Sequence, residues 1–125
     1  MEIRPAVSPG RPYIERYGPG GFKISGTVFT GAVLILPDAA LVWPVTGMEE
    51  VTPESLKPVA EHGDVAILLI GCGRRMTMLT RALREPLRAV GIVIDSMDTA
   101  AACRTYNVLA VEDRRVAAAL LPMTA

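Results

Sequence analysis

The sequence predicts a single α/β domain, in which N-terminal antiparallel β-hairpins join a C-terminal parallel βαβαβ unit in a compact three-layer fold. The first observation is length, because 125 residues suit one hydrophobic core. The second is composition: 50% of the residues are hydrophobic but only 5% are aromatic, which favours closely packed aliphatic strands. The third is a change from strand-like to helical spacing after Val45. We expect an extended arm at residues 1–12, which holds three of the ten prolines, a domain at 13–121 and a tail at 122–125.

The first elements after the arm have the punctuation of β-hairpins. Glycines and the Pro37-Asp38 pair separate short runs rich in β-branched and aromatic residues. Residues 22–24 alternate apolar and polar side chains, which predicts a strand with one exposed face. Residues 33–36 are all apolar and predict a strand covered on both faces. Residues 41–43 are expected to return as its partner after the Pro37-Asp38 turn.

The C-terminal half begins with a helix signal and a buried strand. Thr52 followed by Pro53 predicts a helix start, because threonine caps helices and proline at the first helical position loses no hydrogen bond. Pro58 is expected to shorten or kink this helix. Residues 65–70 are an uninterrupted apolar run and predict a buried strand.

A second helix and strand follow. Residues 79–90 place apolar side chains at helical intervals, and Gly91 is the type of residue that ends a helix. Pro86 is expected to disturb the middle of this helix. Residues 92–95 predict the next strand.

The last elements complete the parallel unit. Asp98 or Thr99 is expected to cap a helix that reaches about residue 109, and residues 116–121 predict a final strand. If the strands at residues 65–70 and 92–95 are parallel neighbours, both end at the same edge of the sheet. Ligands of open α/β sheets bind outside that edge, so the sequence order indicates one crevice.

The two βα junctions at this crevice carry groups able to hold an anion. Glycines leave room for a ligand beside the backbone, and arginine donates hydrogen bonds to phosphate or carboxylate. The expected ligand-binding residues are Gly71, Gly73, Arg74, Asp98, Thr99 and Arg104.

Each of these groups also has a structural interpretation. The glycine loop matches neither the dinucleotide-binding fingerprint nor the P-loop, so a turn with solvated arginines is the alternative. Asp98 and Thr99 cap a helix in this interpretation. Arg104 pairs with a carboxylate, and Asp95, Asp98 and Glu112 are the candidates.

The sequence offers no catalytic residues, and we expect neither a cofactor nor a metal site. Two cysteines and one histidine cannot supply the four ligands of a structural zinc. Cys72 and Cys103 lie near the two junctions. The sequence leaves two interpretations open: the thiols form a close pair, or each cysteine is a buried hydrophobic side chain. His62 is expected to be solvated or to end a helix. Tyr106 and Asn107 are expected to complete packing and the helix end.

Charge and hydropathy limit the classes of partner that we expect the protein to bind. Thirteen basic residues balance thirteen acidic residues, so we expect no binding to nucleic acid or anionic lipid driven by net charge. The apolar runs are much shorter than the roughly 20 residues that cross a bilayer, and no export signal is visible, so a cytoplasmic location in a bacterium is expected. Met76 and Met78 predict an exposed apolar rim suited to a protein partner. The oligomeric state stays open.

Several short motifs, together spanning residues 13–121, carry a family resemblance. They are Gly18-x-Gly20-Gly21-Phe22, Val33-Leu34-Ile35-Leu36-Pro37, Leu69-Ile70-Gly71-x-Gly73, Gly91-Ile92, Met97-Asp98-Thr99, the run from Ala102 to Leu109, and Glu112-x-Arg114-Arg115 with the strand after it. Through these motifs the chain is similar to the Mth-type domain family, whose biochemical function is unknown. The string Ala-Cys-Arg-Thr-Tyr-Asn at residues 102–107 is specific to it. The resemblance implies a three-layer fold and brings no catalytic residues.

Two functions from different classes follow. The family resembled includes an assembly factor of mitochondrial respiratory complex I and an adipogenesis-associated protein, which implies a non-enzymatic protein-binding module. Its partner would be a membrane respiratory complex or an assembly intermediate. The alternative is a small-molecule binding protein or enzyme that holds an anionic ligand in the crevice. We rank protein binding first, because it needs no catalytic base.

Overall fold

The computed structural model describes residue 7 and residues 9–124, and most of the predicted arm at residues 1–12 lies outside this part. The described residues form eight strands, three α-helices and two 3-10 turns. The strands are β1 (Ile14–Gly18), β2 (Gly21–Ile24), β3 (Thr27–Thr30), β4 (Val33–Leu36), β5 (Ala39–Val42), β6 (Ile67–Cys72), β7 (Val93–Met97) and β8 (Val116–Leu121). The helical elements are η1 (Met48–Glu50), η2 (Glu54–Leu56), α1 (Lys57–Ala60), α2 (Arg81–Arg88) and α3 (Thr99–Val111).

The strands make two sheets of different size. β1, β2 and β3 form a small antiparallel sheet, and the central sheet has the order β5-β4-β8-β6-β7. β6 runs parallel to both β7 and β8, whereas β4 is antiparallel to β5 and β8. This arrangement confirms the predicted fold class of antiparallel hairpins joined to a parallel βαβαβ unit.

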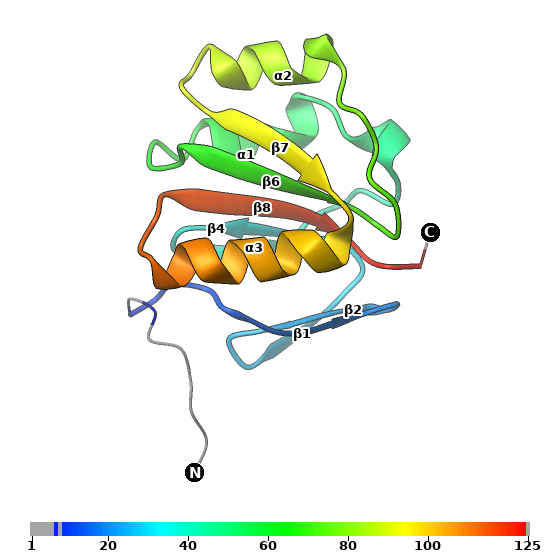
Figure 1. Ribbon diagram of the computed structural model, residues 1–125, viewed down its shortest axis with the longest axis vertical. Coiled ribbons are helices and arrows are strands. Elements are labelled where there is room, and N and C mark those ends of the chain that lie inside the picture. Colours follow the sequence, from blue (N-terminus) through cyan, green and yellow to red (C-terminus); the bar gives the residue numbers. More distant parts are fainter. Residues whose placement is uncertain (1–6, 8, 125) are drawn as a thin grey trace.

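Three layers result, with the central sheet in the middle (Figure 1). Helices α1 and α2 cover one face of this sheet, and α3 with the small sheet covers the other. Alternate side chains of the central strands therefore enter two separate hydrophobic clusters. All four residues of β4 and all six of β8 are buried, which confirms that residues 33–36 are covered on both faces.

Helix α3 attaches the small sheet to the rest of the molecule through three polar side chains. The Asn107 amide donates to the Ile14 carbonyl at 2.8 Å and accepts from the Ile14 N–H at 3.0 Å, so it acts as a short neighbouring strand. The Tyr106 hydroxyl donates to the Pro12 carbonyl at 2.7 Å, and Arg104 Nη1 donates to the Tyr17 hydroxyl at 3.2 Å. Tyr106 and Asn107 thus serve packing, as expected, but they precede the end of the helix.

Both predicted junction strands end later than expected. β6 runs through Gly71 and Cys72, and β7 continues to Met97 instead of ending at residue 95. Gly71 pairs with Met97 on one side and Leu120 on the other, as a central strand residue does. Glycine is needed there because a Cβ would lie 2.8 Å from Leu120 Cδ2 and 3.0 Å from Thr99 Oγ1. The turn therefore begins at Gly73, and the predicted loop at Gly71 is wrong.

The second helix is shorter than the predicted range 79–90. Thr80 caps α2, since its Oγ1 accepts from the Leu83 N–H at 3.2 Å, so Leu79 precedes the helix. Val90 lies beyond the helix and is exposed, not part of the core. Gly91 has a φ of 84°, the left-handed conformation expected of a residue that ends a helix.

The predicted first helix begins as a 3-10 turn, and its α-helical part starts later than expected, at Lys57. Thr52 Oγ1 accepts from the Ser55 N–H at 3.1 Å, and the segment then passes through η2 into the four residues of α1. The α-helix is short, as predicted, but Pro58 lies in its first turn, where proline is tolerated. Trp43 lies just past β5 and not within it; its indole N–H donates to the Ser55 carbonyl at 2.9 Å.

Candidate functional site

The carboxyl ends of β6 and β7 lie side by side, as the proposed crevice requires. The two strands are parallel neighbours from the pair Ile67 and Val93 to the pair Gly71 and Met97. The following segments, at Gly73 and at the start of α3, therefore meet at one edge of the central sheet.

Thr99 occupies the centre of this edge and is fully buried. Its hydroxyl donates to the Leu121 carbonyl at 2.6 Å and accepts from the Gly73 N–H at 2.8 Å. Its own N–H donates to the Gly73 carbonyl at 2.8 Å. One side chain thus links the ends of β6, β7 and β8, and both the donor and the acceptor roles of its hydroxyl are used within the chain.

The neighbouring groups are also engaged in local structure. The Asp98 carboxylate accepts from the Ala101 N–H at 2.9 Å, which caps α3 as expected. Gly71 packs directly against Thr99 and leaves no room for a ligand. The structure therefore brings Gly71, Gly73, Asp98 and Thr99 together, with their facing atoms bonded or packed against one another.

The two arginines of the expected crevice lead away from this centre. Arg74 is exposed, and its Nε donates to the Met123 carbonyl at 3.0 Å. Arg104 contacts the Tyr17 hydroxyl of β1, whereas the sequence suggested a carboxylate partner. The contacts of these two arginines connect the domain to its C-terminal residues and to the small sheet.

The two thiols belong to opposite faces of the central sheet. Cys72 lies in the cluster under α1 and α2, and Cys103 lies in the cluster under α3. Both are buried and free. Burial raises the pKa of the Cys72 thiol and raises the pKa of Cys103 to about 12. The close thiol pair that the sequence left open does not form, and neither thiol has the lowered pKa of a reactive cysteine.

His62 is hydrogen-bonded to Asp38 and is not simply solvated. Its Nε2 lies 2.8 Å from Asp38 Oδ1, which joins the β4–β5 turn to the segment before β6. The hydrogen bond from His62 lowers the pKa of the Asp38 carboxyl below its ordinary value. Within the described residues, no group of three histidine, cysteine, aspartate or glutamate side chains is placed to hold a metal ion.

An exposed basic and apolar surface flanks the same sheet edge. The loop after β6 leads to α2 (Figure 1), and in it Met76 is 53% exposed and Met78 is 75% exposed. We use the name Arg/Met surface for this loop and the outward arginines of α2. Its members are Arg74, Arg75, Met76, Met78, Arg81, Arg84 and Arg88, all of them exposed. The sequence predicted that the methionines are exposed. The spacing of the helical arginines also indicates an exposed basic surface, which was not predicted.

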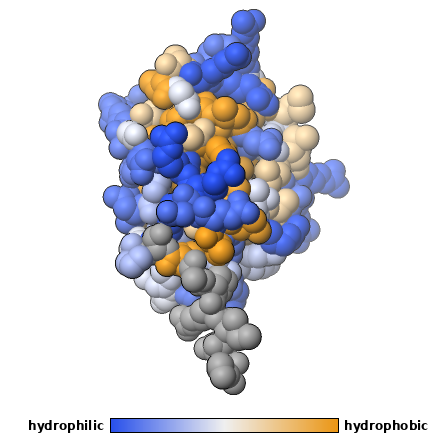
Figure 2. All heavy atoms as spheres, turned by 60° about the vertical axis from the view of Figure 1, so that its left-hand side comes forward, coloured by the Kyte–Doolittle hydropathy of each residue, from blue (hydrophilic) through white to orange (hydrophobic). Residues whose placement is uncertain are grey.

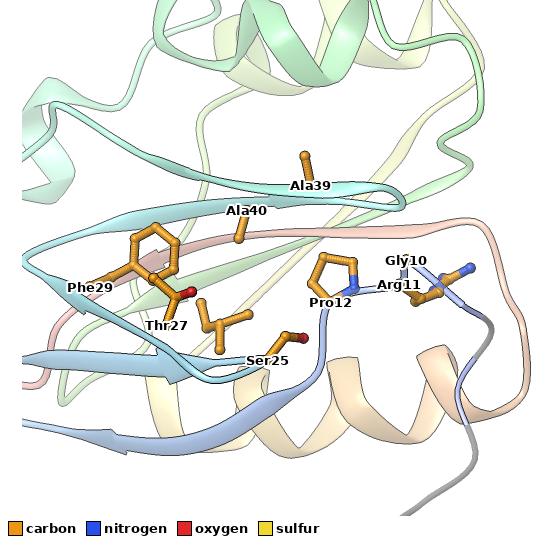
Figure 3. Close-up of a pocket in the computed structure, with 9 residues that line it drawn as sticks. Gly10, Arg11, Pro12, Ser25, Thr27, Phe29, Ala39 and Ala40 are labelled. Carbon is orange, nitrogen blue, oxygen red and sulfur yellow. The ribbon is translucent and has the colours of Figure 1, made fainter.

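A cleft between the β2–β3 hairpin and the β4–β5 hairpin was not predicted by any sequence pattern (Figure 3). Its volume is about 320 Å³, and the Ala40 side chain points across it toward Ser25, Thr27 and Phe29, whereas that of Ala39 points away from them. The full lining is Gly10, Arg11, Pro12, Ile24, Ser25, Thr27, Phe29, Ala39 and Ala40. The Arg11 guanidinium is engaged elsewhere, with the Arg114 carbonyl and Asp113, and its Nε is fully buried without a hydrogen-bond partner among the described residues. The cleft therefore presents small, apolar and hydroxyl groups and no reactive centre.

Comparisons with known proteins place the chain among relatives that share its fold. A family model described as a protein of unknown function (DUF498/DUF598) matches residues 14–121. An uncharacterized protein of Rhodobacter capsulatus is 44% identical over 110 residues, covering 88% of this chain and 84% of that protein. The NADH dehydrogenase [ubiquinone] 1 alpha subcomplex assembly factor 3 of Danio rerio is 36% identical over 87% of this chain, which spans 63% of that relative.

A solved structure supports the fold directly. The solution structure of a Bordetella pertussis protein described as an Mth938-like domain superimposes with a TM-score of 0.83 at 28% identity. The match covers 98% of this chain and 93% of the other. Separately, no helix in the described part of the chain is long and apolar enough to cross a membrane.

Proposed function

Because the chain belongs to the family described as a protein of unknown function (DUF498/DUF598), we propose that it is a non-enzymatic protein-binding module. In this proposal it acts as an assembly factor for a membrane respiratory complex, as the name of the Danio rerio relative suggests. A cytoplasmic location belongs to the same proposal. The exposed methionines carry it, because two flexible apolar side chains on one loop can adapt to the surface of a protein partner.

The geometry of the sheet edge supports this proposal over the alternative of small-ligand binding. A ligand in the crevice would compete with the bonds of Thr99 and with the close packing of Gly71. That alternative stays a hypothesis with a direct test. If Arg74 and Arg104 hold an anion, phosphate raises the unfolding temperature of the wild type and not of the Arg74→Ala, Arg104→Ala double variant.

Capture from the native organism tests the proposed function. The tagged full chain, cross-linked in its own cells, is expected to recover a defined subunit of the NADH dehydrogenase complex from the membrane fraction. The Met76→Ser, Met78→Ser variant is expected to lose most of this recovery. A matched control, Val28→Ser and Val42→Ser, replaces two exposed valines in β3 and β5 and should retain the recovery of the subunit.

Loss of the gene supplies the second readout. A deletion strain is expected to accumulate less assembled NADH dehydrogenase on a native gel, and the wild-type gene should restore it. Normal assembly in the deletion strain, together with no recovered subunit, would overturn the proposal.

A further inference from the structure

The Arg/Met surface is predominantly cationic in a chain that is neutral overall. Residues 74–88 contain five arginines and a single glutamate, which leaves this segment with a net charge of +4. Since the whole chain has a formal net charge of zero, the remaining residues carry the opposite excess. Positive charge is therefore concentrated in this stretch of the chain.

Helix α2 directs its arginines outward. Leu83 and Leu87 are buried against the central sheet. At 3.6 residues per turn, Arg81, Arg84 and Arg88 fall outside this buried stripe, and all three are exposed. Glu85 is exposed as well. The apolar face of α2 is thus packed in the core, and the rest of its surface carries three arginines and one glutamate.

The arginines of this surface are available to a partner. The Arg81 side chain is 90% exposed, and its contact with Glu85 at 3.5 Å is a solvated ion pair of the kind that contributes little. Arg74 is held at one end of the surface by its bond to the Met123 carbonyl. Met76 and Met78 lie between the two groups of arginines in sequence.

We propose that the Arg/Met surface binds an acidic segment of the partner protein, an inference that rests on the proposed function. Carboxylates of that segment pair with the arginines, whose planar guanidinium groups donate to two carboxylate oxygens at once. Apolar side chains between those carboxylates contact the flexible methionines.

Other polyanions fit the surface less well. Insertion into an anionic bilayer uses the apolar face of an amphipathic helix, and in α2 that face is already packed. Residues 74–91 contain no aromatic side chain on which a base could stack. Figure 2 shows one face of the molecule, on which hydrophilic side chains break up the hydrophobic areas.

A labelled peptide of alternating glutamate and leucine residues is the direct probe. Fluorescence anisotropy at low salt is expected to show saturable binding that weakens as salt increases. The Arg75→Glu, Arg84→Glu variant should bind about tenfold more weakly or worse, because it reverses two charges of the surface. The matched control is Arg16→Glu, Arg115→Glu, which makes the same charge change at exposed positions elsewhere and should bind within about twofold of wild type.

Separate measurements test the methionines and the competing polyanions. Met76→Ser, Met78→Ser should weaken the glutamate-leucine peptide and leave a glutamate-serine peptide unaffected. Vesicles rich in phosphatidylserine and a short DNA duplex are measured in parallel. Equal binding of the two arginine variants, or binding of vesicles or duplex but not of the peptide, would overturn the assignment to an acidic protein segment.

The same variants separate this inference from the proposed function. If Arg75→Glu, Arg84→Glu loses both the peptide and the subunit captured from cells, the Arg/Met surface is the docking site. If it loses the peptide but still captures the subunit, the protein-binding function stands and the acidic-segment inference fails.

Discussion

Replacing Thr99 with valine is expected to destabilise the protein more than its modest change in shape suggests. Valine preserves the volume but removes the hydroxyl that bonds the Gly73 N–H and the Leu121 carbonyl. Both groups lie at a buried position, and each unsatisfied buried group costs about 1–3 kcal/mol. The free energy of unfolding should therefore fall by about 2–6 kcal/mol, a large share of the total for a domain of this size.

The measurement is urea unfolding followed by tryptophan fluorescence. Trp43 is the single tryptophan of the sequence and is buried against the segment before α1, so its emission reports the folded core. The unfolding temperature should fall by about 8–24 °C, at about 4 °C per kcal/mol for a chain of this length. Thr99→Ser is the matched control: it keeps the hydroxyl and loses one methyl group, at a cost of about 1 kcal/mol.

The comparison of the two variants decides the argument. If Thr99→Val unfolds at the same urea concentration as Thr99→Ser, the hydroxyl does not link the three strand ends. Amide exchange at Gly73 offers an independent check, because its N–H should exchange faster in the valine variant than in the serine variant.

Three further predictions follow from other contacts. Asn107→Leu removes both amide hydrogen bonds to β1, so it should lower stability by about 1–3 kcal/mol and speed amide exchange in the small sheet; unchanged exchange would contradict the strand-like role of Asn107. Burial raises the pKa of both thiols, that of Cys103 to about 12, so a disulfide reagent at neutral pH should label Cys72 and Cys103 only after unfolding, and fast labelling of native protein would refute this. The hydrogen bond to His62 lowers the pKa of Asp38 in the folded state. The contribution of this carboxylate to the free energy of unfolding is therefore complete above the ordinary aspartate pKa and disappears as the pH falls through the lowered value. Urea unfolding should show the stability gap between wild type and Asp38→Asn closing in acid, and a gap that persists there would be inconsistent with this linkage.

Element type and order followed from residue spacing because the two halves of the chain have different periods. The apolar run at residues 33–36 and the strand at 116–121 carry the signature of strands buried on both faces, and both are so buried. The parallel adjacency of β6 and β7 also followed from the order of elements. Strand ends were less predictable. Glycine is typical of turns, whereas the place of Gly71 within β6 depends on how closely Thr99 approaches it.

The candidate site could be predicted only in part. Asp98 was recognisable as a helix cap from sequence alone, since a cap bonds residues next to it. The partners of Arg104 and Asn107 lie 87 and 93 residues away, on β1, so no local pattern could identify them. The specific string at residues 102–107 is explained largely by this attachment of the small sheet to α3. The cleft between the hairpins depends on the docking of two sheets and left no trace in the spacing.

The position of β8 has a consequence for how the polypeptide reaches its native state. The eighth strand of the fold, Val116–Leu121, lies in the middle of the central sheet, between β4 and β6. During synthesis β4 can pair with β5 at once, but its second neighbour lies more than eighty residues downstream, and the helix that packs on the small sheet also comes later. The central sheet therefore cannot be completed until β8 has left the ribosome.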